Sequence, residues 1–74
     1  MVKAFILLNV KSGTEDIVME KLTKIKVSKA HFIYGKYDFM IIIDSSTIDI
    51  LKTNIFAMQK MPNVISTLTM MVVE

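Results

Sequence analysis

The chain has 74 residues, 53% of them hydrophobic, with nine basic residues, seven acidic residues and no cysteine. This length allows one domain with a small core, because a chain of this size buries only about 60% of its unfolded surface. All the basic residues are lysine, and a net charge of +2 is too small to attract a nucleic-acid backbone strongly, so we expect no direct nucleic-acid binding. The lack of cysteine excludes disulfides, thiolate nucleophiles and thiolate metal ligands.

The apolar content is high for a domain of this size, with a mean hydropathy of +0.51. The longest uninterrupted apolar runs are residues 4–8, 39–43 and 70–73, all far shorter than the roughly 18 residues that a membrane-spanning helix needs. Residues 1–3 lead directly into strand-like sequence, without a secretory signal. We therefore expect a cytoplasmic protein outside the membrane, and we interpret the excess apolar surface as an interface buried between subunits.

The first half of the chain begins with a strand and continues into a helix. Residues 2–10 are apolar on both alternating faces, which is typical of a central strand covered on both sides. Ser12, Gly13 and Thr14 break this strand and offer a hydroxyl N-cap for a helix that extends to about Lys26, with acidic residues in its first turn. Its expected inward stripe is Val18, Leu22 and Ile25, and its expected outward lysines are Lys21, Lys24 and Lys26.

A β-hairpin is predicted next. Residues 28–34 and 37–44 flank a two-residue loop, Gly35-Lys36, in which glycine supplies the positive φ of a type I′ or II′ turn. With Tyr34 opposite Tyr37, Asp38 lies diagonal to His31. One face of the hairpin then carries Ala30, Phe32, Tyr34, Tyr37, Phe39, Ile41 and Ile43, and the other carries His31, Ile33, Asp38, Met40 and Ile42.

The last third of the chain predicts a second helix and a final strand. Ser45, Ser46 and Thr47 cap the helix, which the proline after Met61 brings to an end near Lys60. Its expected apolar stripe is Ile48, Leu51, Ile55 and Met58. The final strand, residues 64–73, has no internal charge, so at a sheet edge we expect it to lie against another subunit.

The element order βαββαβ predicts a single α+β domain over residues 1–74. Two right-handed β-α-β crossovers around a hairpin most simply give a ferredoxin-like fold, in which a four-stranded antiparallel sheet carries both helices on one face. Because the strands are apolar on both sides, we expect the uncovered face to pack on a second sheet in a dimer.

Four segments in the correct order resemble the ligand-binding (RAM) domain of the Lrp/AsnC family of feast/famine regulators, and the similarity spans the whole length. Tyr34-Gly35-Lys36-Tyr37-Asp38 fits the family's Gly-x-Tyr-Asp signature. Residues 4–10 followed by Gly13 resemble its first strand and glycine break, and residues 27–30 resemble the approach to its second strand. Residues 63–70 fit its final strand, with a Val-x-x-Thr-x-Thr pattern.

This resemblance implies a domain that dimerises through its sheet, assembles into octamers or similar rings, and binds free amino acids between dimers, with no cofactor or metal. Full-length relatives add an N-terminal helix-turn-helix, which is missing from these 74 residues. We therefore expect a sensor, or a modulator of full-length Lrp/AsnC transcription regulators by mixed assembly.

The candidate ligand-binding residues are Tyr34, Gly35, Tyr37, Asp38, Thr67 and Thr69. Gly35 allows close approach of the backbone, so hairpin amides can hold a carboxylate while Asp38 pairs with an ammonium group. The ordinary alternative is that Gly35 only forms the turn and Asp38 only hydrogen-bonds nearby. The resemblance implies roles for Tyr34 and for the two threonines, the latter from a neighbouring subunit. Cross-strand packing and strand propensity are the alternatives.

Two other classes of function stay open. His31 beside Asp38 suggests acid/base chemistry, but the sequence supplies no nucleophile, oxyanion hole or second metal ligand, so we expect no enzyme. A small dimeric α/β-barrel enzyme of the isomerase or monooxygenase type would place His31 in a cavity between two sheets. A pure assembly protein would have no pocket, whereas a pocket beside the Gly35 hairpin favours the sensor.

Overall fold

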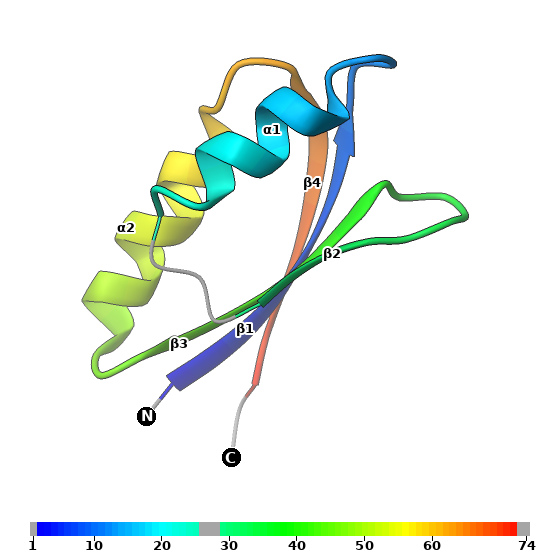
Figure 1. Cartoon of the computed structure of the whole chain (residues 1–74). Helices are drawn as coiled ribbons and strands as arrows, with labels where there is room; N and C mark the ends of the chain where they lie inside the picture. The colour runs from blue at the N-terminus through cyan, green and yellow to red at the C-terminus, as the bar shows by residue number, and fades with distance from the viewer. Residues whose placement is uncertain (1, 26–28, 73–74) are drawn as a thin grey trace.

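The computed structural model describes residues 2–25 and 29–72 and confirms the predicted ferredoxin-like α+β fold. The sheet has the order β2-β3-β1-β4 with antiparallel neighbours. Figure 1 shows α1 and α2 on the same face of this twisted sheet. The elements are β1 (Val2–Val10), α1 (Glu15–Leu22), β2 (Lys29–Phe32), β3 (Phe39–Ser45), α2 (Ile48–Gln59) and β4 (Val64–Met71).

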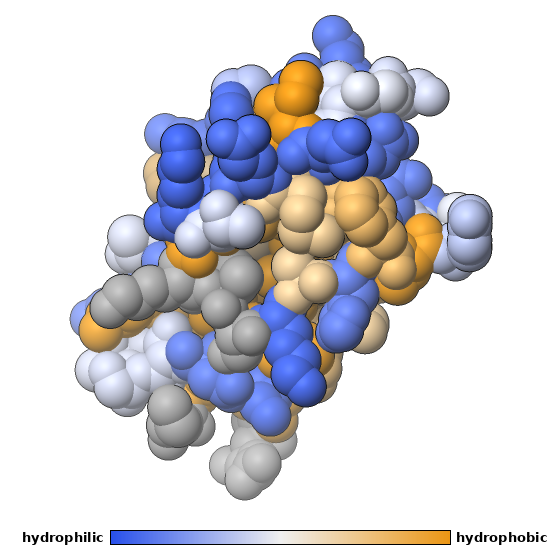
Figure 2. Space-filling view, viewed as in Figure 1, coloured by the Kyte–Doolittle hydropathy of each residue, from blue (hydrophilic) through white to orange (hydrophobic). Residues whose placement is uncertain are grey.

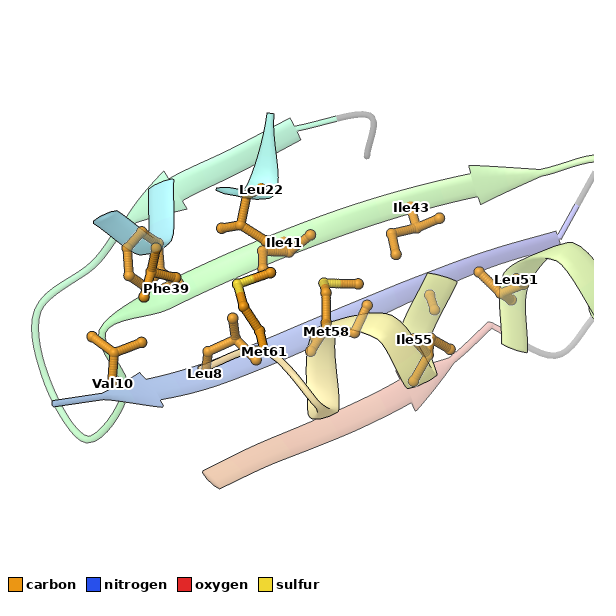
Figure 3. Packing of buried hydrophobic residues seen from close by; sticks show 13 residues of the cluster. Leu8, Val10, Leu22, Phe39, Ile41, Ile43, Leu51, Ile55, Met58 and Met61 are labelled. Atoms are coloured by element: carbon orange, nitrogen blue, oxygen red, sulfur yellow. The ribbon is translucent and has the colours of Figure 1, made fainter. Parts of the chain in front are cut away.

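The core is one layer between the helices and the two central strands. Alternate residues of β1 are buried and lie opposite buried residues of β3, as in the pairs Ile6 with Ile41 and Leu8 with Phe39. The buried helical residues that cover them are Val18, Leu22, Leu51, Ile55 and Met58, as Figure 3 shows for most of this cluster. The period of two along the strands therefore fixes which side chains the helices cover.

The other alternate residues of the strands form an apolar surface that we call the open face. Its apolar members are Phe5, Leu7, Met40, Ile42, Leu68 and Met70. Leu68 and Met70 are 44% and 45% exposed, whereas the central-strand members are half-buried. Neither helix covers this face (Figure 1), and the edge strand β4 contributes to it. The prediction that β1 is apolar on both sides is confirmed, and the sheet-to-sheet dimer stays a prediction.

Helix α1 is shorter than predicted, and its expected side-chain cap is wrong. The helix ends at Leu22, where the amide of Thr23 bonds to the carbonyls of both Met19 and Glu20. Thr14 occupies the N-cap position, but with ψ of 9° it is outside the extended conformation in which a cap oxygen reaches the next amides. Its hydroxyl instead donates to the carbonyl of Lys11 at 2.6 Å.

The inward stripe of α1 is confirmed, with Val18 and Leu22 buried and Ile25 packed against the core. Of the lysines predicted to point outward, Lys24 is exposed and Lys21 is half-buried. Lys26 lies outside the described residues.

Helix α2 begins and ends as predicted. Thr47 is extended, and its hydroxyl accepts a hydrogen bond from the amide of Ile50 at 3.2 Å, so this cap is confirmed. Leu51, Ile55 and Met58 are buried, but the inward position predicted for Ile48 is wrong, because it is 46% exposed. Side chains tilt toward the N-terminus of a helix, so a residue at its first position projects past the packed turns.

The final strand follows the turn after α2. Asn63 precedes β4 and has a φ of 75°. The strand ends at Met71, two residues earlier than predicted, and residue 73 lies outside the described residues.

The predicted two-residue turn Gly35-Lys36 is wrong. The pairing of β2 with β3 stops at Phe32 and Phe39, although its register and the faces of the paired residues are as predicted. Residues 33–38 form a longer loop, in which Gly35 has the expected positive φ, +124°.

Asp38, at the end of this loop, bonds both to β1 and to the residue that follows β2. Its amide donates to the carbonyl of Leu8 at 2.8 Å, and its carboxylate Oδ2 accepts from the amide of Val10 at 2.9 Å. These two bonds tie the loop to β1 just beyond the last ladder pair, Leu8 with Phe39. The carbonyl of Asp38 still accepts from the amide of Ile33 at 3.0 Å, which closes the loop at its base.

Thr47→Ala removes the N-cap acceptor of α2, and we expect it to lower the free energy of unfolding by about 1 kcal/mol. Chemical denaturation followed by circular dichroism measures this loss. Ser46→Ala is the matched control, because Ser46 is the exposed residue just before the cap. An equal loss in both variants would contradict the role of the Thr47 hydroxyl.

Asp38→Ala leaves the partly buried amide of Val10 without its acceptor, and we expect a loss of about 1 kcal/mol or more in the free energy of unfolding. Asp38→Asn keeps an oxygen acceptor of the same shape, so it should cost clearly less. Denaturant midpoints of the two variants test this order. Equal losses would mean that the carboxylate charge, and not the bond to Val10, holds the loop.

Candidate functional site

A pocket with a cavity volume of about 300 Å³ lies between the first turn of α1 and the β2–β3 loop. It is lined by Glu15, Phe32, Ile33, Tyr34 and Asp38. Figure 2 shows apolar surface below the hydrophilic face of α1, on the side toward this loop. The volume lies at the lower end of the range for small-molecule pockets, which is the size of a single amino acid or a similar ligand.

The apolar wall of the pocket includes Phe32, whose ring packs against the core residue Phe39. The ring of Phe32 is 52% exposed, yet its centroid lies 4.7 Å from that of Phe39, which is fully buried. The tilted contact of the two rings, at 35°, fixes Phe32 at the end of β2. Phe32 therefore presents a positioned aromatic surface to the pocket instead of a mobile side chain.

Two of the predicted site residues, Tyr34 and Asp38, line this pocket. Tyr34 is fully exposed, so it has no cross-strand packing role. Asp38 is half-buried and is fixed by its bond to Val10. Gly35 and Tyr37 lie in the same loop but are not among the residues that line the cavity.

The structure does not bring Thr67 and Thr69 to this pocket. They pair with Leu8 and Ile6, which places both on the helix-covered face of β4, at the sheet edge opposite β2. The hydroxyl of Thr69 is buried without a hydrogen-bond partner within the described part of the chain. A role for these threonines at the pocket therefore requires another subunit.

Sequence reasoning missed Glu15, Phe32 and Ile33 as lining residues. From its position in the sequence, Glu15 is only a favourable charge at a helix N-terminus, and Phe32 is only a strand residue. The sequence held one usable signal, because the strand–glycine–helix connection at Gly13 brings the start of α1 back over the sheet. The proximity of α1 to the β2–β3 loop depends on tertiary packing, so no local sequence pattern could have predicted it.

His31 and Asp38, the two residues considered for acid/base chemistry, engage different parts of the sheet and do not bond to each other. His31 is exposed and lies opposite Met40 on the open face, while the carboxylate of Asp38 bonds to β1.

Across residues 2–25 and 29–72, the structure contains no group of three or more His, Asp and Glu side chains that could hold a metal ion. The helices of these same two segments include none that is long and apolar enough to cross a membrane.

Comparison with known proteins finds relatives among solved structures. No protein-family model and no curated protein matches the chain. The crystal structure of an FFRP, a feast/famine regulatory protein, is 37% identical over 99% of this chain and 100% of its own, with a TM-score of 0.91. The hypothetical protein PHS023 from Pyrococcus horikoshii is also 37% identical, over 100% of this chain and 92% of its own, with a TM-score of 0.89.

A longer relative places the same fold within a larger protein. AsnC of E. coli is 26% identical over 99% of this chain but only 51% of its own, with a TM-score of 0.87. The chain thus corresponds to about half of AsnC and to nearly the full length of the other two proteins. On these identities and coverages, the chain belongs to the Lrp/AsnC family of feast/famine regulators, as a domain of the RAM type.

Proposed function

We propose that this chain, acting as a single domain in the cytoplasm, is an amino-acid-sensing and oligomerisation module of a Lrp/AsnC regulatory system. It acts without catalysis and modulates full-length regulators by mixed assembly. The observation that carries the proposal is that the Gly-x-Tyr-Asp signature loop forms one wall of a ligand-sized pocket, with Tyr34 and Asp38 among its lining residues. Membership of a family of regulators supports a regulatory role.

The chemistry of the pocket suits an amino acid with an apolar side chain. Asp38 offers a fixed negative charge to an ammonium group, and charge-assisted hydrogen bonds of this kind are the stronger ones. Phe32, Ile33 and Tyr34 offer apolar surface to the side chain. The open backbone around Gly35, where an added Cβ would contact nothing within 4 Å, leaves room for close approach to the loop amides.

Assembly follows from the open face. A monomer rarely exposes so continuous an apolar surface across a whole sheet, and a second copy that packs its own open face there would bury it. We propose that such dimers associate further into an octamer or a similar ring. Since Thr67 and Thr69 lie at the sheet edge opposite β2, they would contribute to a ligand site of a neighbouring subunit in that ring.

The rival enzyme hypothesis needs a polar cavity inside the sheet-to-sheet interface. The pocket described above instead lies beside the β2–β3 loop, and the helix-side residue Phe32 lines it. His31 faces the opposite side of the sheet. The position of the pocket therefore supports the sensor over the enzyme, and its existence supports the sensor over a pure assembly protein.

A panel of the twenty amino acids at millimolar concentration, tested by denaturant unfolding, should include at least one that selectively raises the midpoint. A ligand at 100 times its Kd adds about 2.7 kcal/mol to native-state stability. Tyr34→Ala should abolish this shift without lowering stability, because Tyr34 is fully exposed. Asp38→Asn should reduce the shift strongly.

Phe56→Ala is the control for the tyrosine variant, since Phe56 is an exposed aromatic residue on α2, away from the pocket-lining residues. It should leave the ligand-induced shift unchanged. No shift with any amino acid would overturn the sensor proposal. A shift that survives both Tyr34→Ala and Asp38→Asn would move the binding site elsewhere.

Leu68→Lys should convert the assembly to monomers, because it puts a charge on the open face. Ile50→Lys is the matched control: Ile50 is 47% exposed on α2 and Leu68 is 44% exposed on β4, so both changes start from similar exposure. Sedimentation velocity should find the wild type and Ile50→Lys at dimer size or larger. A monomeric wild type, or equal effects of both variants, would contradict assembly through the open face.

A further inference from the structure

The one histidine of the chain lies level with the apolar centre of the open face. His31 is the edge member of a cross-strand row that continues through Met40, Leu7 and Leu68. We infer that assembly through the open face is switched by pH, because a second copy covers His31 when the imidazole is neutral and is disfavoured when it is protonated. This inference rests on the assembly part of the proposed function, and it states how that assembly is regulated.

The polar pairs of the open face suit a second copy of this chain as its partner. They lie at the two ends of the apolar centre and are made within the chain. The ammonium of Lys3 is 3.8 Å from Oδ1 of Asp44 at one end, and the side-chain amide of Asn9 donates to the hydroxyl of Ser66 at 3.2 Å at the other. A partner therefore has to supply apolar surface but no matching charge, and the open face of a second copy supplies it.

The groups around His31 offer no counter-charge to its protonated form. Lys29 lies two residues away on the same strand and face, and the facing residues of β3 are Met40 and Ile42. Asp38 occupies the position diagonal to His31, but its carboxylate bonds to β1 and lines the pocket. Both helices lie on the other face of the sheet (Figure 1), so they bring no charge to this surface.

A second copy adds the same groups from its own open face, and these do not solve the problem. Its Lys3 and Asp44 already pair with each other, and its Lys29 repels a charged imidazole. Burial of an imidazolium against apolar surface without a counter-charge is costly, so protonation of His31 opposes association. A lysine at the same edge avoids this cost, because its long side chain keeps the ammonium group in solvent while its stem covers apolar surface.

The direction of the pH dependence follows from proton linkage. Each copy of His31 binds a proton more readily in the free monomer than in the dimer, so acid favours the monomer. Histidine is the side chain that ordinarily changes charge between pH 5 and 8, and this chain has one histidine and no cysteine. The dimer is therefore fully favoured above the titration of histidine and is lost as the pH falls through it.

Sedimentation equilibrium of the whole chain at pH 8 and pH 5.5 tests the switch. The dimer Kd of the wild type should be about 100-fold larger at pH 5.5, because exclusion of a proton costs about tenfold for each histidine and a dimer has two. His31→Gln puts a neutral side chain at this position and should have the same Kd at both pH values.

The double variant His31→Gln with Gln59→His is the matched control. It keeps the composition of the chain and moves the histidine to an exposed position at the end of α2, away from the open face. Its Kd should not change with pH. A pH dependence that persists in this variant would belong to another group or to the histidine in any position, and would overturn the role of His31.

Three other results separate this inference from the proposed assembly. An equal wild-type Kd at pH 8 and pH 5.5 would overturn the switch and leave the assembly standing. Tighter association at pH 5.5 would mean that the protonated imidazole gains a counter-charge, which also overturns the switch. A wild type that is monomeric at pH 8 would overturn the assembly itself, and the switch with it.

Discussion

The bond between Asp38 and the end of β1 is the interaction on which the site depends. The amide of Asp38 donates to the carbonyl of Leu8 and its carboxylate accepts from the amide of Val10, so Asp38 is tied to β1 just beyond the β1–β3 ladder. Its carbonyl still accepts from the amide of Ile33, although the pairing of β2 with β3 ends at Phe32 and Phe39. The loop that results is long enough to border a cavity, which a two-residue turn could not do. One carboxylate therefore stabilises the sheet and shapes the pocket.

A second constraint is that two short helices cannot cover a four-stranded sheet on both sides. Helix α1 has 8 residues and α2 has 12, and both lie on one face. The strands are nevertheless apolar on both alternating sets of residues, so neither helix covers the open face within the described part of the chain. The pocket opens on the helix side, as the position of Phe32 opposite Phe39 requires. Burial of the open face by a second copy would therefore leave the pocket accessible.

The sequence was sufficient wherever a local pattern decides the structure. Period-two alternation identified the buried faces of the strands, and the register that pairs Phe32 with Phe39 followed from the position of the glycine. The prediction failed where the local structure depends on a hydrogen bond to a residue far away in the sequence. Asp38 bonds to a residue 28 positions away, so nothing near Gly35 revealed that the turn would open. For the same reason the local sequence indicates only a helix charge at Glu15, whereas tertiary packing places it in the wall of the pocket.

The sheet order divides the residues that the family resemblance groups together. Tyr34 and Asp38 follow β2, while Thr67 and Thr69 lie on β4 at the opposite edge, with β3 and β1 between them. A site that uses all four must be shared by subunits, and linkage then requires ligand binding and assembly to strengthen each other by the same factor. The lining residues of the pocket described here, which include two carboxylates and two aromatic side chains, all come from one chain. Under the proposed function, a ligand that contacts these lining residues alone would bind without regard to assembly, so coupling of binding to assembly requires contacts from Thr67 and Thr69 of a neighbouring subunit.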